Sequence, residues 1–284
     1  MGRRVREGNF ILLLLPALLV VVLVYVVPVI DTTVLAFRDM RGEGFVGFDN
    51  FRRVGSSFWP SLVRTAIWTF GSVIPAMIIG LVGSLLFVDD FRGKTLLMSL
   101  SLLPYCVPLI IVATFWAILY NPSYGLINTF LLGAGLIKQP IEFLSYRMAM
   151  PSVILVRVWR ATPFAFIAYY AGLKSVPRDI LEAADIDGAD GIQKFFYVTA
   201  PQLRSVTLTT ALVLVIWTAL VFDIIYAMTG GGPIDATKIL PIDIYTQLMC
   251  VGDIGVTSAM TLLTVLVLLL FSLVFWKLSH GDEM

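Results

Sequence analysis

The chain has 284 residues, of which 58% are hydrophobic and only 14% are charged. This composition lies outside the range of soluble globular domains and places the chain among membrane proteins. The formal net charge of +1 argues against a nucleic-acid surface, and a single histidine, His280, with two distant cysteines argues against a catalytic or metal centre built on those residues.

Six segments reach the length of about 20 apolar residues that a membrane-spanning helix requires. They are residues 10–30, 64–88, 96–120, 152–173, 206–228 and 257–278. The first is not expected to be a cleaved signal peptide, because its apolar run is longer than such peptides carry and no Ala-x-Ala site follows. The sequence therefore predicts an all-α membrane protein with about six spans, in a single domain over residues 1–284.

Basic residues favour one orientation by a small margin. The segments on the side of Arg3, Arg4 and Arg6 hold slightly more Lys and Arg than the opposite segments, which predicts that both termini are cytoplasmic. On the outer side, residues 121–151 are expected to form a short lateral helix, with Tyr120, Tyr124 and Tyr146 in an interfacial aromatic belt.

An inner turn ends in Gly93-Lys94-Thr95, which looks like the end of a phosphate-binding loop. The glycine that such a loop requires five positions earlier is Val88, so the motif fails. The chain is therefore not expected to hydrolyse ATP by itself.

Ionisable residues within the predicted spans are Arg157, Arg160 and Asp223. Such groups are costly in hydrocarbon and usually face a cavity or each other. Arginine offers five donors in a rigid fork, and aromatic faces at Phe164 and Trp217 are expected nearby. These five residues form a candidate pathway for a polyhydroxylated substrate.

Each charged member of that pathway has a structural alternative. Arg157 could instead pair with Asp223 or with a second subunit, or extend its charged end to the membrane interface. Arg160 and Asp223 could hold the helices together without touching a substrate.

The most distinctive segment is an acidic loop between the fourth and fifth spans. Residues 178–190 carry one arginine against five acids, which are Asp179, Glu182, Asp185, Asp187 and Asp190. A helix that lies on a bilayer is normally rich in Lys and Arg, so this loop predicts a protein partner; an ordinary solvated loop is the alternative. Gly188 allows a sharp turn within it.

The same loop resembles the EAA loop of the permease subunits of bacterial ATP-binding-cassette importers. The matching residues are Glu182-Ala183-Ala184, Asp187-Gly188-Ala189, Phe195, Val198 and Pro201, with Val198 and Ala200 departing from the usual Ile and Leu. Four further elements, in the same order and spacing, resemble sugar-type permeases. They are residues 45–51 (FVGFDNF), 125–128 (GLIN), 159–164 (WRATPF), and Phe222-Asp223 with 229–233 (TGGGP).

The resemblance implies a type I importer permease fold in the bacterial cytoplasmic (inner) membrane, and import of a carbohydrate, a di- or oligosaccharide. It implies a second homologous permease, two ATPase subunits that bind ATP and Mg, and an extracytoplasmic sugar-binding protein. The chain itself is then no enzyme and holds no cofactor or metal.

The resemblance also assigns roles to two loops. Residues 178–203 would form the cytoplasmic coupling loop, with Glu182, Ala183, Ala184, Asp187 and Gly188 transmitting motion from the ATPases. The segment Gly230, Gly231, Gly232 and Pro233 would reach towards the binding protein, an ordinary flexible turn being its alternative.

Two other functions fit the sequence less well. A stand-alone secondary transporter or channel would need coupling carboxylates at the membrane midplane, where only Asp223 is available, and no inverted repeat of broken helices is seen. A membrane-embedded enzyme would need paired carboxylates, a histidine cluster or a nucleophile motif, and the sequence has none of them.

Overall fold

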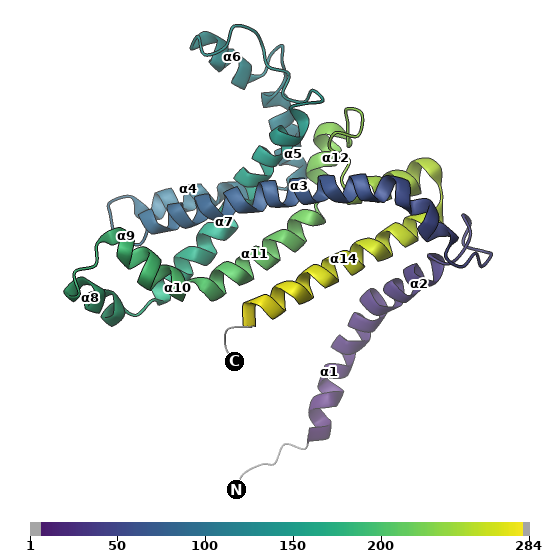
Figure 1. Ribbon diagram of the computed structural model, residues 1–284, viewed down its shortest axis with the longest axis horizontal. Coiled ribbons are helices and arrows are strands. Elements are labelled where there is room, and N and C mark those ends of the chain that lie inside the picture. Colours follow the sequence, from purple (N-terminus) through teal and green to yellow (C-terminus); the bar gives the residue numbers. More distant parts are fainter. Residues whose placement is uncertain (1–6, 281–284) are drawn as a thin grey trace. The chain divides into compact units, whose positions relative to one another are not determined.

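The computed structural model describes the backbone of residues 7–280 and the side chains of residues 14–277. Arg3, Arg4 and Arg6, on which the predicted orientation partly rests, and the side chain of His280 lie outside these ranges. Within them the chain is helical, with one isolated bridge between Arg38 and Phe45 and no strand (Figure 1).

The helices before the acidic loop begin with α1 (Glu7–Val21), the π-helical η1 (Val22–Val26), α2 (Val27–Leu35) and α3 (Asp49–Leu86). Next come α4 (Lys94–Cys106), α5 (Leu109–Leu119), α6 (Leu126–Gly133) and α7 (Ala149–Ser175). The acidic loop holds α8 (Arg178–Ile186), α9 (Gly191–Lys194), η2 (Phe195–Thr199) and α10 (Ala200–Gln202). The remaining helices are α11 (Arg204–Ala219), α12 (Asp223–Thr229), α13 (Leu240–Thr246), η3 (Gln247–Val251) and α14 (Ile254–His280).

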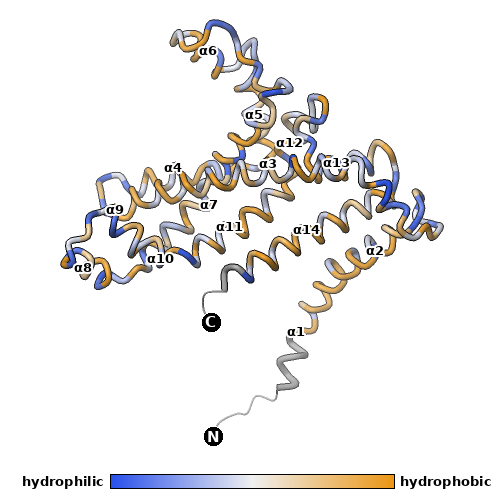
Figure 2. The backbone as a smooth tube through the Cα atoms, in the orientation of Figure 1, coloured by the Kyte–Doolittle hydropathy of each residue, from blue (hydrophilic) through white to orange (hydrophobic). Residues whose placement is uncertain are grey.

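Four helical stretches within the described residues are long and apolar enough to cross a membrane, and two bent helix pairs raise the number to six if each pair is one span. The four are Leu14–Leu35, Asp49–Leu86, Ala149–Ser175 and Ile254–Lys277. Figure 2 shows the apolar residues along these helices and the hydrophilic ones gathered in the connecting loops. The all-helical membrane class predicted from the sequence is confirmed.

The third predicted span is not straight. Helices α4 and α5 meet at an angle of 96°. Val107 and Pro108, between them, both have extended backbone torsions. Proline disfavours helical torsions in the residue before it, so Pro108 explains why α4 ends at Cys106.

The fifth predicted span is shorter than expected. Helix α11 ends at Ala219, and Asp223 begins the separate helix α12, where its side chain is exposed. The placement of Asp223 inside one continuous helix over 206–228 was therefore wrong. A carboxylate is stable in the first turn of a helix because unpaired backbone N–H groups point towards it.

The chain divides into two compact units, and the first consists of Met1–Trp59 with Ile244–Val267. Within it, the Asn50 amide donates to the carbonyl of Arg38 at 2.6 Å. A Cβ at Gly255 would lie 2.4 Å from that same carbonyl oxygen, so only glycine fits there. Arg53 donates to the buried carboxylate of Asp253 at 2.6 Å. Asn50 of the FVGFDNF element and Arg53 just after it thus hold the start of α3 close to the start of α14.

The second unit, Pro60–Asp243 with Leu268–Met284, holds the rest of α3 and α4 to α12 around two clusters of buried side chains. In the first, the indole of Trp68 donates to the Thr218 carbonyl at 2.9 Å. Near the second, a Cβ at Gly80 would lie 2.7 Å from the Ala165 Cβ. Small residues at such contacts let membrane helices approach closely, which fixes α7 beside α3 and α11.

Candidate functional site

The acidic loop folds into short helices joined by a tight turn at Gly188. The φ angle of Gly188 is +78°, and a Cβ there would meet no atom within 4 Å. The backbone torsion, and not lack of space, therefore requires glycine at this position. The Gly188 N–H donates to the Asp185 carbonyl at 3.1 Å, and the Ala189 N–H donates to the Ala184 carbonyl at 3.0 Å.

The turn is continued by a capping box at the start of α9. The Asp190 carboxylate accepts from the Gln193 N–H at 2.8 Å, and the Gln193 side chain accepts from the Asp190 N–H at 3.0 Å. Lys194 forms an ion pair with Asp185, which joins α9 back to α8. These contacts brace α8, the Gly188 turn and α9 against one another.

The exposed surface of the loop is acidic with an apolar tip. Glu182, Ala183 and Asp187 are exposed, whereas Ala184 packs inward. Ile186 is 87% exposed and lies one turn after Glu182. The sequence interpretation missed Ile186, although an isoleucine directly between Asp185 and Asp187 was a visible signal.

The structure places Arg157 in the interior, where its side chain is only 6% exposed. Its Nε and Nη2 donate to the Thr218 hydroxyl at 3.1 and 2.8 Å. Within the described residues Thr218 is the hydrogen-bond partner of Arg157 and no carboxylate pairs with it, and Asp223 is exposed at the start of α12. The alternatives of an ion pair with Asp223 and of extension to the interface are both contradicted.

Three predicted pathway residues do come together, around a tyrosine that the sequence interpretation missed. The Arg160 guanidinium lies 4.6 Å from the ring centroid of Tyr105. The ring of Phe164 lies 6.2 Å from Tyr105 and 5.1 Å from the half-exposed Trp217. We name Tyr105, Arg160, Phe164 and Trp217 the aromatic–arginine cluster.

The cluster has an unused donor. The Nε of Arg160 is buried and has no hydrogen-bond partner among the described residues. Leaving a buried donor unpaired costs about 1–3 kcal/mol, so a ligand that offers an oxygen there recovers that energy. The aromatic rings beside it supply flat apolar faces. The combination suits a molecule with hydroxyl groups at the edge of a ring.

The glycine-rich loop after α12 is a fixed turn. Gly230 and Gly231 have φ angles of +59° and +93°, and a Cβ at Gly231 would lie 2.8 Å from Ile242. The Thr237 hydroxyl donates to the Gly232 carbonyl at 2.9 Å, and its N–H donates to the Gly231 carbonyl at 3.0 Å. These contacts argue against the alternative of a flexible turn.

At the tip of that loop stands a residue that the sequence interpretation did not single out. Ile234 is 86% exposed and has a φ of +47°, and the next residue, Asp235, has a φ of +62°. A positive φ is strained for a β-branched residue. The chain thus holds an apolar side chain outward at a conformational cost.

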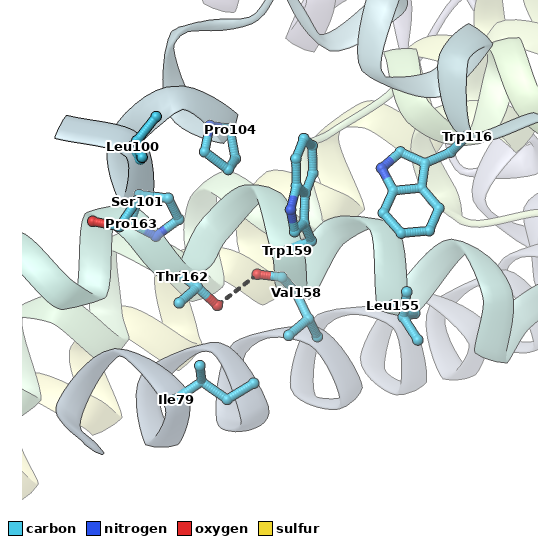
Figure 3. A pocket seen from close by; sticks show the side chains of 10 residues that line it. All are labelled: Ile79, Leu100, Ser101, Pro104, Trp116, Leu155, Val158, Trp159, Thr162 and Pro163. Carbon is cyan, nitrogen blue, oxygen red and sulfur yellow. Dashed lines mark hydrogen bonds between the residues drawn. The ribbon is translucent and has the colours of Figure 1, made fainter. Parts of the chain in front are cut away.

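A separate pocket of about 410 Å³ lies among α3, α4, α5 and α7 (Figure 3). Its hydroxyl groups are already used, because Thr162 donates to the Val158 carbonyl at 2.8 Å and Ser101 to the Met98 carbonyl at 2.7 Å. The other lining residues are apolar or aromatic. They are Ile79, Leu100, Pro104, Trp116, Leu155, Val158, Trp159 and Pro163.

Comparison with protein families decides the identity. The model described as "Binding-protein-dependent transport system inner membrane component" matches residues 76–278, which include the acidic loop and the aromatic–arginine cluster. The chain belongs to this family. The family depends on a binding protein, so its members are not stand-alone transporters, and the resemblance recognised in the sequence is confirmed.

Relatives in the family cover almost the whole chain. A trehalose/maltose transport system permease, MalF of Thermococcus litoralis, is 36% identical over 279 residues, which are 95% of this chain and 92% of that protein. The sn-glycerol-3-phosphate transport system permease UgpA of Escherichia coli is 30% identical over 282 residues, 95% of this chain and 93% of the relative.

Solved structures establish the fold of this inner-membrane permease. A bacterial ABC transporter for import of the acidic polysaccharide alginate matches with a TM-score of 0.87 at 20% identity, covering 98% of this chain and 97% of that one. An amino acid ABC transporter matches with a TM-score of 0.54 at 19% identity, covering 83% and 99%. The predicted importer permease fold is thereby confirmed.

Proposed function

We propose that this chain is one of two permease subunits of an ATP-driven importer for a di- or oligosaccharide. The aromatic–arginine cluster carries the proposal, because it combines flat apolar faces with the unpaired Nε donor of Arg160. Sugars offer the matching surface of C–H faces and hydroxyl edges. The trehalose/maltose relative and the alginate transporter, both carbohydrate systems by name, support this class of cargo.

The coupling role belongs to the acidic loop. Two ATPase subunits, which hold ATP and Mg, would dock on its cytoplasmic surface around Glu182 and Ile186, and both termini of the chain would be cytoplasmic. Helix α8 follows α7 after two residues, and α11 begins right after the loop. Because the loop is internally braced, a push on it tilts the loop as one body and shifts the end of α7 relative to the start of α11.

That displacement changes the proposed cargo site, because the residues of the site lie on the displaced helices. Arg160 and Phe164 lie on α7 and Trp217 on α11, so a relative shift of the two helices opens or closes the cluster. The ATPase pair favours one arrangement when ATP is bound and the other after hydrolysis. This is alternating access, driven by a partner's different affinities for two states.

Reconstituted uptake tests the proposal directly. In vesicles that hold this chain, a second permease, the ATPase pair and ATP, labelled maltose should enter when the binding protein is added outside. A uronic-acid oligosaccharide tested in parallel distinguishes neutral from acidic cargo, and leaving out each subunit in turn tests each partner. ATP-independent uptake by this chain alone would contradict the proposal.

The glycine-rich loop gives a prediction about the binding protein. Ile234→Gly should reduce stimulation of ATP hydrolysis by the loaded binding protein several-fold, because the apolar tip at the contact is removed. The complex should become no less stable, since relief of a strained φ favours folding by about 1 kcal/mol. ATPase assays and thermal unfolding measure the two effects.

The neighbouring residue supplies the control for that test. Asp235→Gly relieves a positive φ of similar size, +62°, and leaves the Ile234 side chain in place. It should therefore keep full stimulation. If both variants lose stimulation of ATP hydrolysis equally, the effect comes from the changed loop backbone and not from the Ile234 side chain.

A further inference from the structure

Two lysines meet at one end of the packed helices α4 and α7. Lys94 is the first residue of α4, and Lys174 lies in the last turn of α7. Both ammonium groups donate to the carbonyl of Val88, at 3.5 Å from Lys94 and 2.7 Å from Lys174. Both also lie near the ring of Tyr170, at 5.5 and 5.9 Å from its centroid.

The two lysines share one nearby carboxylate, that of Asp90. Asp90 pairs with Lys94 at 2.8 Å, and this hydrogen bond, followed by the charges of Lys94, Lys174 and Arg178, lowers the pKa of its carboxyl group. Within the part of the chain that the structure describes, Lys174 has no carboxylate partner. Like charges this close repel each other, so an anion from outside the chain would stabilise them.

The two lysines lie on the same faces of α4 and α7 as residues that line the apolar pocket. On α7, Trp159, Pro163, Tyr170 and Lys174 follow at intervals of four, seven and four residues, which places them on one stripe of the helix. On α4, Ser101 lies seven residues after Lys94, on the same face.

Exposed apolar side chains fill the interval between the lysines and the pocket. They are Leu97 on α4, which is 48% exposed, and Ile167 on α7, which is 45% exposed. A face that is cationic at one end and apolar along its length matches an amphiphile better than a sugar.

The dimensions match one leaflet of a bilayer. The pocket residues of α4, Leu100 to Pro104, lie six to ten residues after Lys94. This corresponds to about 9–15 Å along a helix, while half of a hydrocarbon core is about 15 Å thick. An acyl chain whose headgroup contacts the lysines would therefore reach the pocket.

We propose that this face of α4 and α7 binds an anionic phospholipid, with its phosphate at Lys94 and Lys174 and one acyl chain in the pocket beside Trp159. The pocket's hydroxyl groups are paired with backbone carbonyls and the rest of its lining is largely apolar, so it accepts hydrocarbon, although the buried Nε1 of Trp116 has no partner within the described residues. The site uses other side chains of α4 and α7 than the aromatic–arginine cluster, and it lies on a different face of α7 from Arg157.

Lipid retention in the assembled transporter tests the headgroup contact. Native mass spectrometry of the complete complex should detect bound phosphatidylglycerol in preference to phosphatidylcholine. Lys94→Gln with Lys174→Gln should weaken phosphatidylglycerol binding on the order of tenfold, whereas arginine at both positions should preserve it. Arg204→Gln, at the start of α11, is the control and should leave retention unchanged.

A second variant tests the acyl chain. Ser101→Phe fills the pocket without removing a charge and should lower retention of phosphatidylglycerol, while Trp159→Phe should reduce quenching of tryptophan fluorescence by phosphatidylglycerol with brominated chains. If the double glutamine variant does not assemble, these two variants still decide the question. Inorganic phosphate at millimolar concentration that displaces the lipid completely, or equal binding of phosphatidylcholine, would overturn the proposal.

Discussion

Gly188→Val should lower ATP-driven uptake on the order of tenfold while the complex still assembles. Gly188 holds a φ of +78° in the turn after α8. A residue with a Cβ loses about 1–2 kcal/mol in that conformation, and a β-branched one loses more. The loop would relieve the strain by changing the turn, and α8 would lose its orientation towards the ATPases. Vesicle uptake and the amount of co-purified ATPase measure the two outcomes.

Gly188→Asn is the matched control for this prediction. Asparagine adopts left-handed torsions far more readily than valine, and no atom lies within 4 Å of a Cβ at this position. Uptake should therefore stay near the wild-type level. If valine and asparagine act alike, the torsion at Gly188 is not what transmits motion.

The docking surface of the loop can be tested beside the turn. Glu182→Lys reverses a charge on the exposed face of α8 without touching the Gly188 turn or the Asp190 cap. It should therefore reduce uptake by weakening the contact with the ATPase pair. A wild-type uptake rate in this variant would show that Glu182 is not part of the surface that contacts the ATPase pair.

Arg157→Met should reduce uptake about tenfold to hundredfold. This is the effect expected from the loss of one charge-assisted hydrogen bond, which contributes roughly 1.5–3 kcal/mol. The thermal stability of the complex should stay equal or rise. A buried guanidinium whose partner in the described chain is one neutral hydroxyl costs more in desolvation than that contact returns. A cation kept in a membrane helix at such a cost points to a functional role.

Two companion variants separate the roles of Arg157. Thr218→Val removes its acceptor and should destabilise the complex by about 1–3 kcal/mol, whereas Thr218→Ser should not. Asp223→Asn combined with Arg157→Met should give additive effects, because the structure places no ion pair between those residues. A loss of stability in Arg157→Met that matches its loss of uptake would make Arg157 structural.

Several properties of this protein could be predicted from the sequence, because they depend on residues that are close together in the chain. Hydrocarbon demands about 20 apolar residues per span, so the helical membrane class followed from composition and the spacing of polar segments. The acidic loop was visible because its charges and Gly188 lie within a few residues of one another. The residues that match the family pattern also lie close together in the sequence, so the resemblance was visible in the same segment.

Tertiary packing decided which distant groups meet. Periodicity placed Arg157 and Arg160 on nearby faces of one helix, but it carried no information about what lies opposite. Thr218, 61 residues after Arg157, became its partner in place of Asp223, because the chain leaves the helix at Ala219. Tyr105 reached Arg160 from the bent third span. Such contacts depend on how whole helices pack, which no short window of sequence specifies.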